Sequence, residues 1–567
     1  MATQIQKQSQ PNNTIDPNSG FSSHSRTFHS LRPKVPLPPP SEPLSLADYV
    51  LSLLAGAETG TGTGTSGLID SATDSHLSYS LFRRQVSSLA SSLQSVTPLS
   101  KGHVALILSP SSLHVPVLYF SLLSLGVVIA PANPLSSPSE LTHLVRLTKP
   151  DIAFATSAVA NTIPTLRFGT ILMDSPLFSS MLDANNAGPQ RVELSQSDSA
   201  AILFSSGTTG RVKGVQLTHR NLIALIAGFY HLKLVMDGEP HPVSLFTLPL
   251  FHVFGFFMLV RAVALGETLI FMQRFDFQGM LRAVEKYKIT YMPVSPPLVL
   301  ALAKSDLVNK YDLSSLRFLG SGGAPLGKEV SEDFKAKFPN VEIGQGYGLT
   351  ESGGAAARML LPDELERHGS VGRLAENMEA KIVDPVTGEA LLPGLKGELW
   401  LRGPTIMKGY VGDEKATVET MDSEGWLKTG DLCYFDSDGF LYIVDRLKEL
   451  IKYKAYQVPP AELEHILHTN PEIADAAVVP YPDEEAGQIP MAFVVRKPGS
   501  NITADQVMEF VAKQVSPYKK IRRVSFINSI PKSPAGKILR RELVDYALSS
   551  DNGPGLKIIV KHLVYHV

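Results

Sequence analysis

The sequence predicts an α/β protein with a large N-terminal domain of parallel sheets covered by helices, a small β subdomain, and a smaller mobile C-terminal α+β domain. Three observations support this prediction. Short apolar stretches alternate with amphipathic ones, as in sheets that helices cover on both faces. From about Met378 the pattern changes to short strands with glycine-rich turns. The length of 567 residues exceeds what one hydrophobic core usually fills.

The alternation can be followed along most of the chain. We expect strands at Val104–Leu108, Val127–Ala130, Asp151–Ala155, Thr170–Met173, Ala200–Phe204, Ser244–Leu248, Thr268–Met272, Ile289–Pro293, Leu316–Leu319 and Val341–Gln345. The amphipathic stretches predict helices at Ser111–Leu125, Phe254–Leu265, Gly279–Lys288, Pro297–Lys304 and Lys328–Phe338. Ligands of such folds bind at the carboxyl ends of the strands, where we expect each candidate loop to lie.

The later elements and the ends of the chain divide it further. Strands are expected at Glu379–Val383, Gly397–Arg402, Leu441–Val444, Ala476–Pro480 and Met491–Arg496, and helices at Ala461–His468 and Asp505–Gln514. We expect a disordered or surface-draped arm at 1–45, a large domain at 46–445, a small domain at 446–550 and an atypical tail at 551–567. For the tail we hypothesise an alternative or read-through terminus.

Composition excludes several classes of function. Hydrophobic residues make up 44% and charged residues 19%, as in soluble globular proteins. A net charge of −2 gives no electrostatic basis for binding nucleic acid. The single cysteine, Cys433, excludes a disulfide framework, and no Cys/His metal-binding spacing occurs. The apolar region Val243–Val260 contains Pro249, His252 and Gly255, so a buried strand, turn and helix explain it better than a membrane span.

A loop of small residues follows the apolar run at 200–204. It reads Ser205-Ser206-Gly207-Thr208-Thr209-Gly210-Arg211-Val212-Lys213-Gly214. Glycines let a backbone approach a ligand, hydroxyl and amide groups donate to oxyanions, and Lys213 adds a mobile positive charge. An amphipathic segment opens at Thr218, so we expect the order strand, loop, helix, which favours phosphate binding over a plain surface turn. The spacing is not that of a Walker A loop.

Two further loops follow predicted strands. Gly320-Ser321-Gly322-Gly323-Ala324-Pro325 permits close approach of an adenine or acyl group, and a tight βα turn explains it equally well. Gly344-Gln345-Gly346-Tyr347-Gly348-Leu349-Thr350-Glu351-Ser352 is more specific. In it, Tyr347 offers a face for a purine, Thr350 can donate to a phosphate, and Glu351 can hold Mg²⁺.

Two C-terminal stretches add charged groups. Asp431, in Thr429-Gly430-Asp431-Leu432, is the kind of carboxylate that binds ribose hydroxyls, and Asp445-Arg446 supplies a guanidinium group. Lys448 and Glu449 could equally form a solvated charged face. Pro531-Lys532-Ser533-Pro534-Ala535-Gly536-Lys537-Ile538-Leu539-Arg540 predicts a loop in which Lys537 alone could be a solvent-exposed lysine, and it resembles a catalytic-lysine motif in which a mobile lid carries that lysine into the cleft.

From about Ser205 to Arg541, these motifs resemble, in order, those of the adenylate-forming superfamily, which includes acyl-CoA synthetases, luciferases and the adenylation domains of peptide synthetases. Phe251-His252, Ser321–Pro325, Gly344–Gly348 and Asp445–Lys454 look closest to plant 4-coumarate–CoA ligases and their peroxisomal-type relatives. The resemblance implies an AMP-binding (adenylation) domain at 46–445 and a C-terminal lid domain at 446–550.

The resemblance also implies an ATP-dependent carboxylic acid–CoA ligase that uses ATP, Mg²⁺ and coenzyme A. The acid would attack ATP to give acyl-AMP and pyrophosphate, and coenzyme A would then displace AMP. Catalytic roles fall on Lys537 and Lys213, with His252 at the mouth of the acyl pocket and Glu351 holding the metal. Residues implied to bind ATP or AMP are Ser205, Ser206, Gly207, Thr208, Thr209, Gly210, Lys213, Ala324, Gln345, Gly346, Tyr347, Thr350, Asp431, Arg446 and Lys537.

Further positions are implied for the acyl group and for coenzyme A. They are Phe254, Met258, Lys448 (also the hinge) and Lys452 for the acyl or acyl-adenylate, and Arg274, Lys454, Ala455 and Gln457 for coenzyme A. Val212 departs from the family's proline, and Ala455 from its glycine, which puts the thioester step in doubt. Phe254 and Met258 replace polar residues of hydroxycinnamate-using relatives. Fatty or oxylipin-type acids therefore stay open beside hydroxycinnamates.

Two other readings compete with the ligase. One is an adenylating enzyme with a different acyl acceptor, and the other is a catalytically reduced relative that binds nucleotide or acyl ligand. By resemblance we expect a monomer in the cytoplasm or peroxisome that binds small molecules, with no nucleic acid and no membrane span. The chain ends Tyr565-His566-Val567 and so lacks the Ser-Lys-Leu peroxisomal address.

Overall fold

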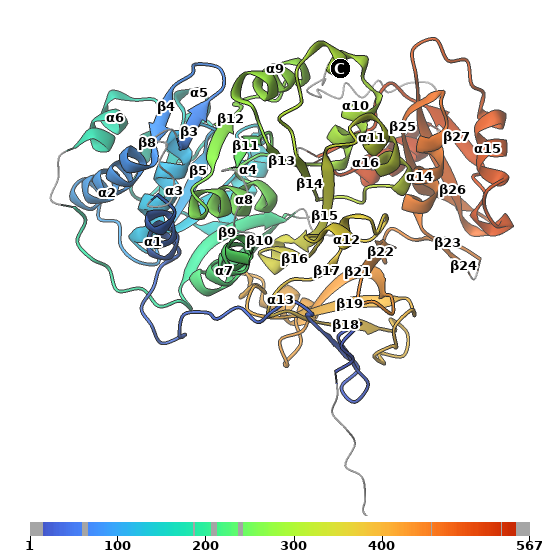
Figure 1. Ribbon diagram of the computed structural model, residues 1–567, viewed down its shortest axis with the longest axis horizontal. Coiled ribbons are helices and arrows are strands. Elements are labelled where there is room, and N and C mark those ends of the chain that lie inside the picture. The colour runs from blue at the N-terminus through green and yellow to red at the C-terminus, as the bar shows by residue number, and fades with distance from the viewer. Residues whose placement is uncertain are drawn as a thin grey trace, which may run out of the picture.

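The computed structural model describes residues 15–58, 66–184, 188–205, 212–235, 242–454, 456–533 and 536–550. Strands of these residues form sheets of seven, nine, six and five strands. In Figure 1 the two largest sheets lie at the left and centre, the six-stranded sheet lies below them, and the five-stranded sheet lies at the right. The α/β class predicted from the sequence is confirmed.

The two largest sheets are parallel in their central strands. The seven-stranded sheet runs β20 (Gly409–Tyr410), β10 (Lys213–Thr218), β9 (Ser199–Ser205), β6 (Val128–Pro131), β5 (Val104–Leu108), β7 (Ile152–Ala155), β8 (Thr170–Leu172). The nine-stranded sheet runs β17 (Arg373–Leu374), β16 (Gly354–Arg358), β15 (Glu342–Leu349), β14 (Phe318–Ser321), β13 (Tyr291–Val294), β11 (Val243–Phe246), β12 (Thr268–Phe271), β3 (Gly67–Asp70), β4 (His76–Ser78). The alternation of apolar and amphipathic stretches therefore predicted these central strands correctly.

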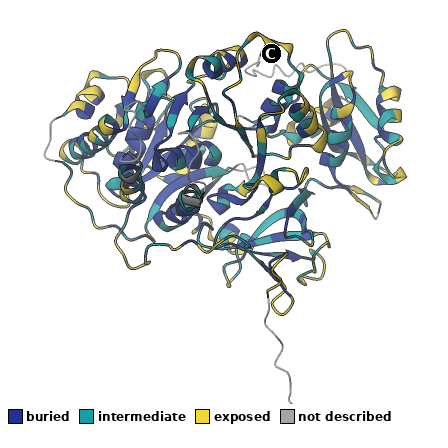
Figure 2. Cartoon of the chain, in the orientation of Figure 1, coloured by how far each residue is buried: buried dark blue, intermediate teal, exposed yellow. Residues whose placement is uncertain are grey.

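Helices lie against both sheets. They include α1 (Leu46–Glu58), α2 (Tyr79–Val96), α3 (His114–Ser124), α4 (Pro138–Thr148), α6 (Pro176–Asp183), α7 (His219–Val235), α8 (Val253–Ala264), α9 (Phe277–Tyr287), α10 (Pro296–Lys304) and α11 (Lys328–Lys337). The largest core joins α2, α3, α7 and α8 to strands of both sheets. Figure 2 shows the buried residues along these strands and helices and the exposed ones on the outer helices and loops. The apolar region Val243–Val260 forms β11 and most of α8, as expected.

The six-stranded sheet is antiparallel and includes the N-terminal arm. It runs β1 (Phe21–Ser22), β2 (Thr27–His29), β18 (Glu379–Val383), β19 (Gly397–Arg402), β21 (Leu427–Phe435), β22 (Leu441–Arg446). Within the arm, Arg32 forms an ion pair with the buried Glu364, with 2.9 Å between Nη2 and Oε2. Residues 15–45 thus belong in part to this sheet, while residues 1–14 lie outside the described residues.

The five-stranded sheet has a separate core on each face. Its strands are β24 (Tyr456–Val458), β23 (Ile451–Tyr453), β26 (Gly487–Arg496), β25 (Ile473–Asp483) and, beside β26, β27 (Arg523–Phe526). Alternate residues of β25 face opposite sides, so Val478 packs with α14 (Pro460–Thr469) and α15 (Ala504–Ala512), and Val479 packs with α16 (Arg540–Ser550). These elements lie together at the right of Figure 1.

The structure corrects two sequence predictions around the candidate loops. Lys213–Thr218 is strand β10, which pairs antiparallel with β9 before α7 begins, so the predicted order of strand, loop and helix is wrong. Strand β10 thus lies between the loop sequence and α7. Tyr347 lies on β15, which runs on to Leu349 and pairs with β16, so the stretch from 344 to 349 is strand and not loop. Within the described residues, no helix has both the length and the apolarity that a membrane span requires.

Candidate active site

One group of predicted residues gathers around Glu351, in the turn after β15. Ser205, at the end of β9, donates its hydroxyl to Glu351 Oε1 over 3.0 Å, and Tyr410 of β20 donates to the same oxygen over 2.9 Å. Lys213 opens β10, and its Nζ lies 4.4 Å from the centre of the Tyr410 ring. The hairpin β9–β10 and the edge strand β20 thus bring a cation and two hydroxyl groups to one carboxylate.

A second group forms where β15 meets β21. Tyr347 donates its phenol to Asp431 Oδ2 over 2.5 Å, and Arg446 Nε lies 3.5 Å from Asp431 Oδ1. Burial raises the pKa of the Asp431 carboxyl, although Arg446 and Tyr347 act in the opposite direction. The pairing of β21 with β22 sets Asp431 opposite Arg446, which explains why two residues fifteen apart share one site.

Lys537 reaches this second group from the C-terminal part of the chain. Its Nζ lies 3.9 Å from Glu449 Oε1, and the charges of Arg446 and Asp431 also act on it. Burial, together with Arg446, lowers the pKa of the Lys537 ammonium group to about 8 against the opposing effect of Glu449 and Asp431. Lys537 therefore pairs with Glu449 and lies within range of the Asp431 and Arg446 charges.

The loop is held there by contact with the large domain. Gly536 has a φ of +82°, and a Cβ built on it would lie 3.1 Å from Ser295 Oγ and 3.4 Å from Pro297 Cγ. Any side chain at this position would be strained and would press on the first turn of α10. A glycine is therefore needed for the loop to lie this close to the large domain.

The segment around Lys448 joins the two parts of the chain. The N–H of Leu447 donates to Gly430 O over 2.9 Å, which ties it to β21. The N–H groups of Glu449 and Leu450 donate to Arg446 O over 3.0 and 3.2 Å. The Glu449 side chain binds Arg540 of α16. Lys448 thus lies between a residue tied to the six-stranded sheet and one tied to the C-terminal elements.

His252 is the N-cap of α8, Phe254 lies in its first turn and Met258 in its middle. His252 Nδ1 accepts the N–H of Phe254 over 3.3 Å, and burial lowers the pKa of the imidazole to about 4. Phe254 stacks on Phe257, and a Cβ built on Gly322 would lie 3.4 Å from the Phe254 ring. Met258 is buried in the largest core. The Phe254 ring thus meets the predicted loop 320–325.

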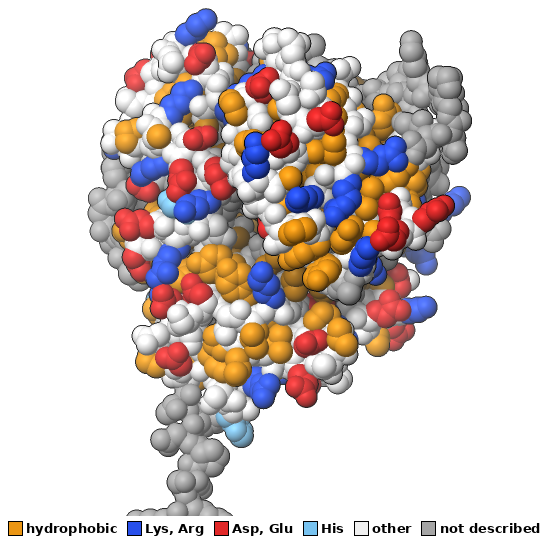
Figure 3. Space-filling view, turned by 90° about the vertical axis from the view of Figure 1, so that its right-hand side faces the viewer, with side chains coloured by type: hydrophobic (Ala, Val, Ile, Leu, Met, Phe, Trp, Pro, Cys, Tyr) orange, Lys and Arg blue, Asp and Glu red, His pale blue; other side chains and the backbone are white. Residues whose placement is uncertain are grey.

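The residues predicted to bind coenzyme A are spread over two sheets. Arg274 is exposed just after β12, whereas Lys454 and Gln457 are exposed on the β23–β24 hairpin, as is Lys452, which was predicted for the acyl-adenylate. Ala455 lies outside the described residues. Beside them, Tyr456 stacks on Tyr518 with 4.3 Å between ring centres. The face in Figure 3 carries interspersed basic and acidic side chains.

The remaining residues predicted to bind ATP or AMP differ in how far they are buried. Gln345 and Thr350 are buried, while Gly346 and Ala324 are half-buried. Ser206, Gly207, Thr208, Thr209 and Gly210 lie outside the described residues. The residues that sequence reasoning missed are Tyr410, Glu464 and Arg540, together with the structural use of Glu449. Tyr410 carries no local motif, since its place depends on the pairing of β20 with β10.

Comparison with protein families and relatives identifies the family of this chain. Residues 63–411 match the model of the AMP-binding enzyme family, and residues 462–537 match that of the AMP-binding enzyme C-terminal domain. The chain is 60% identical to 4-coumarate–CoA ligase-like 9 of Arabidopsis thaliana over 95% of this chain and 98% of that protein. It is 45% identical to Peroxisomal OPC-8:0-CoA ligase 1 of the same plant, over 95% and 99%.

The chain therefore belongs to the AMP-binding enzyme family, within its 4-coumarate–CoA ligase-like group of acid–thiol ligases. The predicted resemblance is confirmed. Among solved structures, ATP-bound MatB from Rhodopseudomonas palustris superposes with a TM-score of 0.78 at 24% identity, over 89% of this chain and 99% of that one. MenE from Bacillus subtilis, in complex with OSB-AMP, gives 0.74 at 24%, over 87% and 97%. Both likenesses confirm the fold.

Proposed function

We propose that this enzyme joins a carboxylic acid to AMP at the expense of ATP and then transfers the acyl group to coenzyme A. The observation that carries the proposal is the ion pair of Lys537 with Glu449 within range of the Asp431 and Arg446 charges, while Ser205 and Tyr410 bind Glu351 in the turn after β15 and Lys213 lies over the Tyr410 ring. The residues around Asp431 would hold the ribose, and those around Glu351 would hold the phosphates. The 4-coumarate–CoA ligase-like relatives support the same reaction.

The first step needs charge stabilisation more than a general base. A carboxylic acid with a pKa of about 4 to 5 is already ionised near neutrality, so the obstacle is repulsion between two anions. The ammonium groups of Lys537 and Lys213 would offset the charge that develops at the α-phosphate. The Asp431 carboxylate would accept ribose hydroxyls, and Arg446 would stay beside it.

Glu351 is the residue that fits a magnesium ion. Mg²⁺ usually takes one or two protein carboxylates and completes its shell with phosphate oxygens and water. Within the part of the chain that the structure describes, no cluster of three or more His, Cys, Asp or Glu occurs, so one carboxylate and the nucleotide would share the ion. When bound there, the ion would neutralise phosphate charge, while the Ser205 and Tyr410 hydroxyls orient Glu351.

An apolar acid would fit against the aromatic surface that begins at the Phe254 ring. Phe254 stacks on Phe257 with 5.7 Å between ring centres, and Phe257 stacks on Phe229 with 6.0 Å. None of these rings offers a hydroxyl to a phenol. A fatty or oxylipin-type acid therefore suits this surface better than a hydroxycinnamate, and the OPC-8:0–CoA ligase among the relatives favours it too.

A panel of acids tests the proposal. We would incubate the enzyme and ATP with 4-coumarate, hexadecanoate or OPC-8:0, with and without coenzyme A, and measure pyrophosphate and acyl-CoA. Acid-dependent pyrophosphate release together with acyl-CoA is expected for at least one apolar acid. Pyrophosphate release without a thioester would identify an enzyme with another acyl acceptor. No release with any acid would favour a catalytically reduced relative.

The pH profile of adenylation provides a second expected result. Because the ammonium form of Lys537 is the active one, kcat/KM for ATP should fall as pH rises through about 8, the pKa that burial and Arg446 give this group in the free enzyme. The measurement is acid-dependent ATP–pyrophosphate exchange from pH 6 to 10. Lys537→Arg should remove the alkaline decline, since a guanidinium stays protonated over this range. A decline that persists in Lys537→Arg would contradict the assignment.

A further inference from the structure

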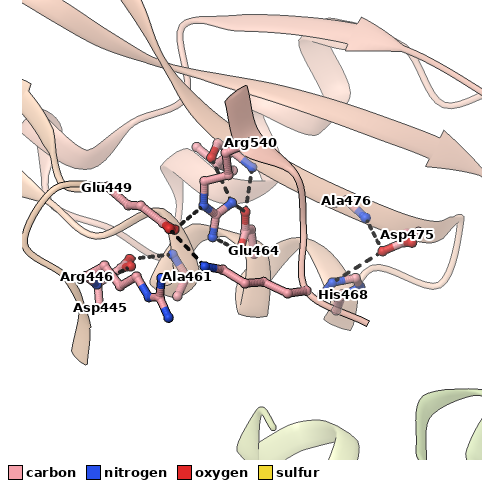
Figure 4. A network of polar contacts seen from close by, with 11 residues as sticks. Asp445, Arg446, Glu449, Ala461, Glu464, His468, Asp475, Ala476 and Arg540 are labelled. Carbon is pink, nitrogen blue, oxygen red and sulfur yellow. Dashed lines mark hydrogen bonds and ion pairs between the residues drawn. The ribbon is translucent and has the colours of Figure 1, made fainter. Parts of the chain in front are cut away.

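The environment of Lys537 contains a partly buried chain of alternating charges that the proposed chemistry does not use. Arg540 donates from Nε to Glu449 Oε2 over 2.8 Å and from Nη2 to Glu464 Oε2 over 2.9 Å, and its Nη1 also binds Glu464. In Figure 4 the guanidinium group of Arg540 lies between the carboxylates of Glu449 and Glu464. Glu464 is fixed in turn, because its Oε1 accepts the N–H of Val478 over 2.7 Å.

Glu449 is the member of this chain that faces Lys537. One of its oxygens is taken by Arg540, and the other, Oε1, lies 3.9 Å from Lys537 Nζ. Despite burial, which by itself would raise it, the pKa of the Glu449 carboxyl is held below its usual value by Arg540, Lys537 and Arg446. Glu449 is therefore ionised near neutral pH, and its Oε1 faces Lys537.

Lys537 needs such a partner because cations surround it. Arg446 of β22 and Arg540 of α16 both repel its ammonium group. Attraction comes from Glu449 and from Asp431 of β21, whose carboxylate also serves Tyr347 and Arg446. Without Glu449, two guanidinium groups and a single shared carboxylate would act on Lys537. The ammonium group would then be less stable in this position and would lose its proton more readily.

We propose that Glu449 is a positioning residue for Lys537: its carboxylate keeps the lysine charged and beside Asp431, and Arg540 and Glu464 hold that carboxylate in place. The inference rests on the proposed adenylation, since it assigns Lys537 its partner there. Glu449, Glu464, Lys537 and Arg540 all follow Lys448 in the chain. The pair would therefore stay together if the C-terminal part turned about Lys448, and the lysine would arrive at ATP already charged.

The test compares three forms of the full chain without needing the natural acid. Wild type, Glu449→Gln and Glu462→Gln are labelled with trace acetic anhydride from pH 6 to 11, and the acetylation of each lysine peptide is measured by mass spectrometry. Glu462 is a matched control, because it is a carboxylate of the same domain that pairs with another lysine, Lys519. We expect the labelling midpoint of Lys537 to fall by about one unit in Glu449→Gln, at the low end of the shift caused by an opposite charge at this range. It should stay unchanged in Glu462→Gln.

Three outcomes would overturn the inference. They are an unchanged Lys537 midpoint in Glu449→Gln, an equal shift in Glu462→Gln, and an equal shift of the other lysines in Glu449→Gln, which would show that the effect is not specific to Lys537. A Glu449→Asp variant, which keeps the charge, should recover at least half of the shift. The result is independent of the proposed function, because labelling needs no turnover. Failure of the acid panel would leave this measurement standing, and an unchanged midpoint would leave the adenylation proposal standing.

Discussion

Replacing Lys537 with alanine is expected to lower the rate of adenylation by about 10²–10³-fold or more, the loss that follows removal of one preorganised charge-stabilising donor. The side chain is the one that the C-terminal loop delivers to Asp431 and Arg446, and Gly536 lets that loop lie against α10. The measurement is acid-dependent ATP–pyrophosphate exchange with an acid that the panel has identified. Thioester formation from supplied acyl-AMP should be retained, because it needs no attack on the α-phosphate.

Arg541→Ala is the matched control for this prediction. Arg541 is an exposed cation on the first turn of α16, four residues from Lys537, so its removal tests the effect of net charge alone. We expect its exchange rate to stay within about twofold of wild type, as surface changes usually do little. Equal loss of both half-reactions in Lys537→Ala, or a comparable loss in Arg541→Ala, would refute the assigned role.

Arg358→Met should lower the stability of the large domain by about 3–5 kcal/mol, the cost of leaving one member of a buried ion pair without its partner. Arg358 on β16 pairs with Glu376, and both side chains are nearly inaccessible at 6% and 7% exposed. The guanidinium also lies 4.1 Å from the centre of the Phe229 ring. Methionine would keep much of that packing but would leave the Glu376 carboxylate buried and unpaired. The measurement is unfolding in urea followed by tryptophan fluorescence.

Two companion variants separate the charge effect from other causes. Arg358→Met/Glu376→Leu removes both charges and should recover most of the lost stability, because a buried pair replaced by apolar groups is often neutral. Arg367→Ala breaks the exposed pair with Asp438 and should cost about 1 kcal/mol or less. A double variant less stable than Arg358→Met, or an Arg358→Met no worse than Arg367→Ala, would be inconsistent with this account.

Hydrophobic patterning predicted the sheets well where each strand is short and continuous. Glu379–Val383 and Gly397–Arg402 have the predicted bounds, since both alternate between a buried and a less buried side and end at polar turns. β10 was not predicted, although Val215 and Leu217 are buried and Gln216 between them is less so, because we expected the small-residue loop to lead directly into the helix that begins at His219. The alternation of apolar and polar residues over Val215, Gln216, Leu217 and Thr218 was a readable signal.

Some residues of the candidate site lie in local sequence motifs, whereas others depend on contacts between distant parts of the chain. Motifs located Glu351, Asp431, Arg446 and Lys537, whose functional roles remain predictions. Tyr410 could not be found in this way, because it reaches Glu351 through the pairing of β20 with β10, almost two hundred residues earlier in the chain. Glu449 and Arg540 lay within quoted motifs, but a charged run is usually solvated, and three-dimensional contact was needed to show that these two bind each other.

The segment around Lys448 has an energetic consequence for any movement of the C-terminal elements. A rotation there would break the two backbone hydrogen bonds to Arg446 O, each worth about 0.5–1.5 kcal/mol net, and water would replace them. The backbone hydrogen bonds of this connection therefore oppose such a rotation only weakly. In such a movement the difference between two orientations would be set by what each one buries or binds, because a ligand shifts an equilibrium only by its differential affinity for the two states.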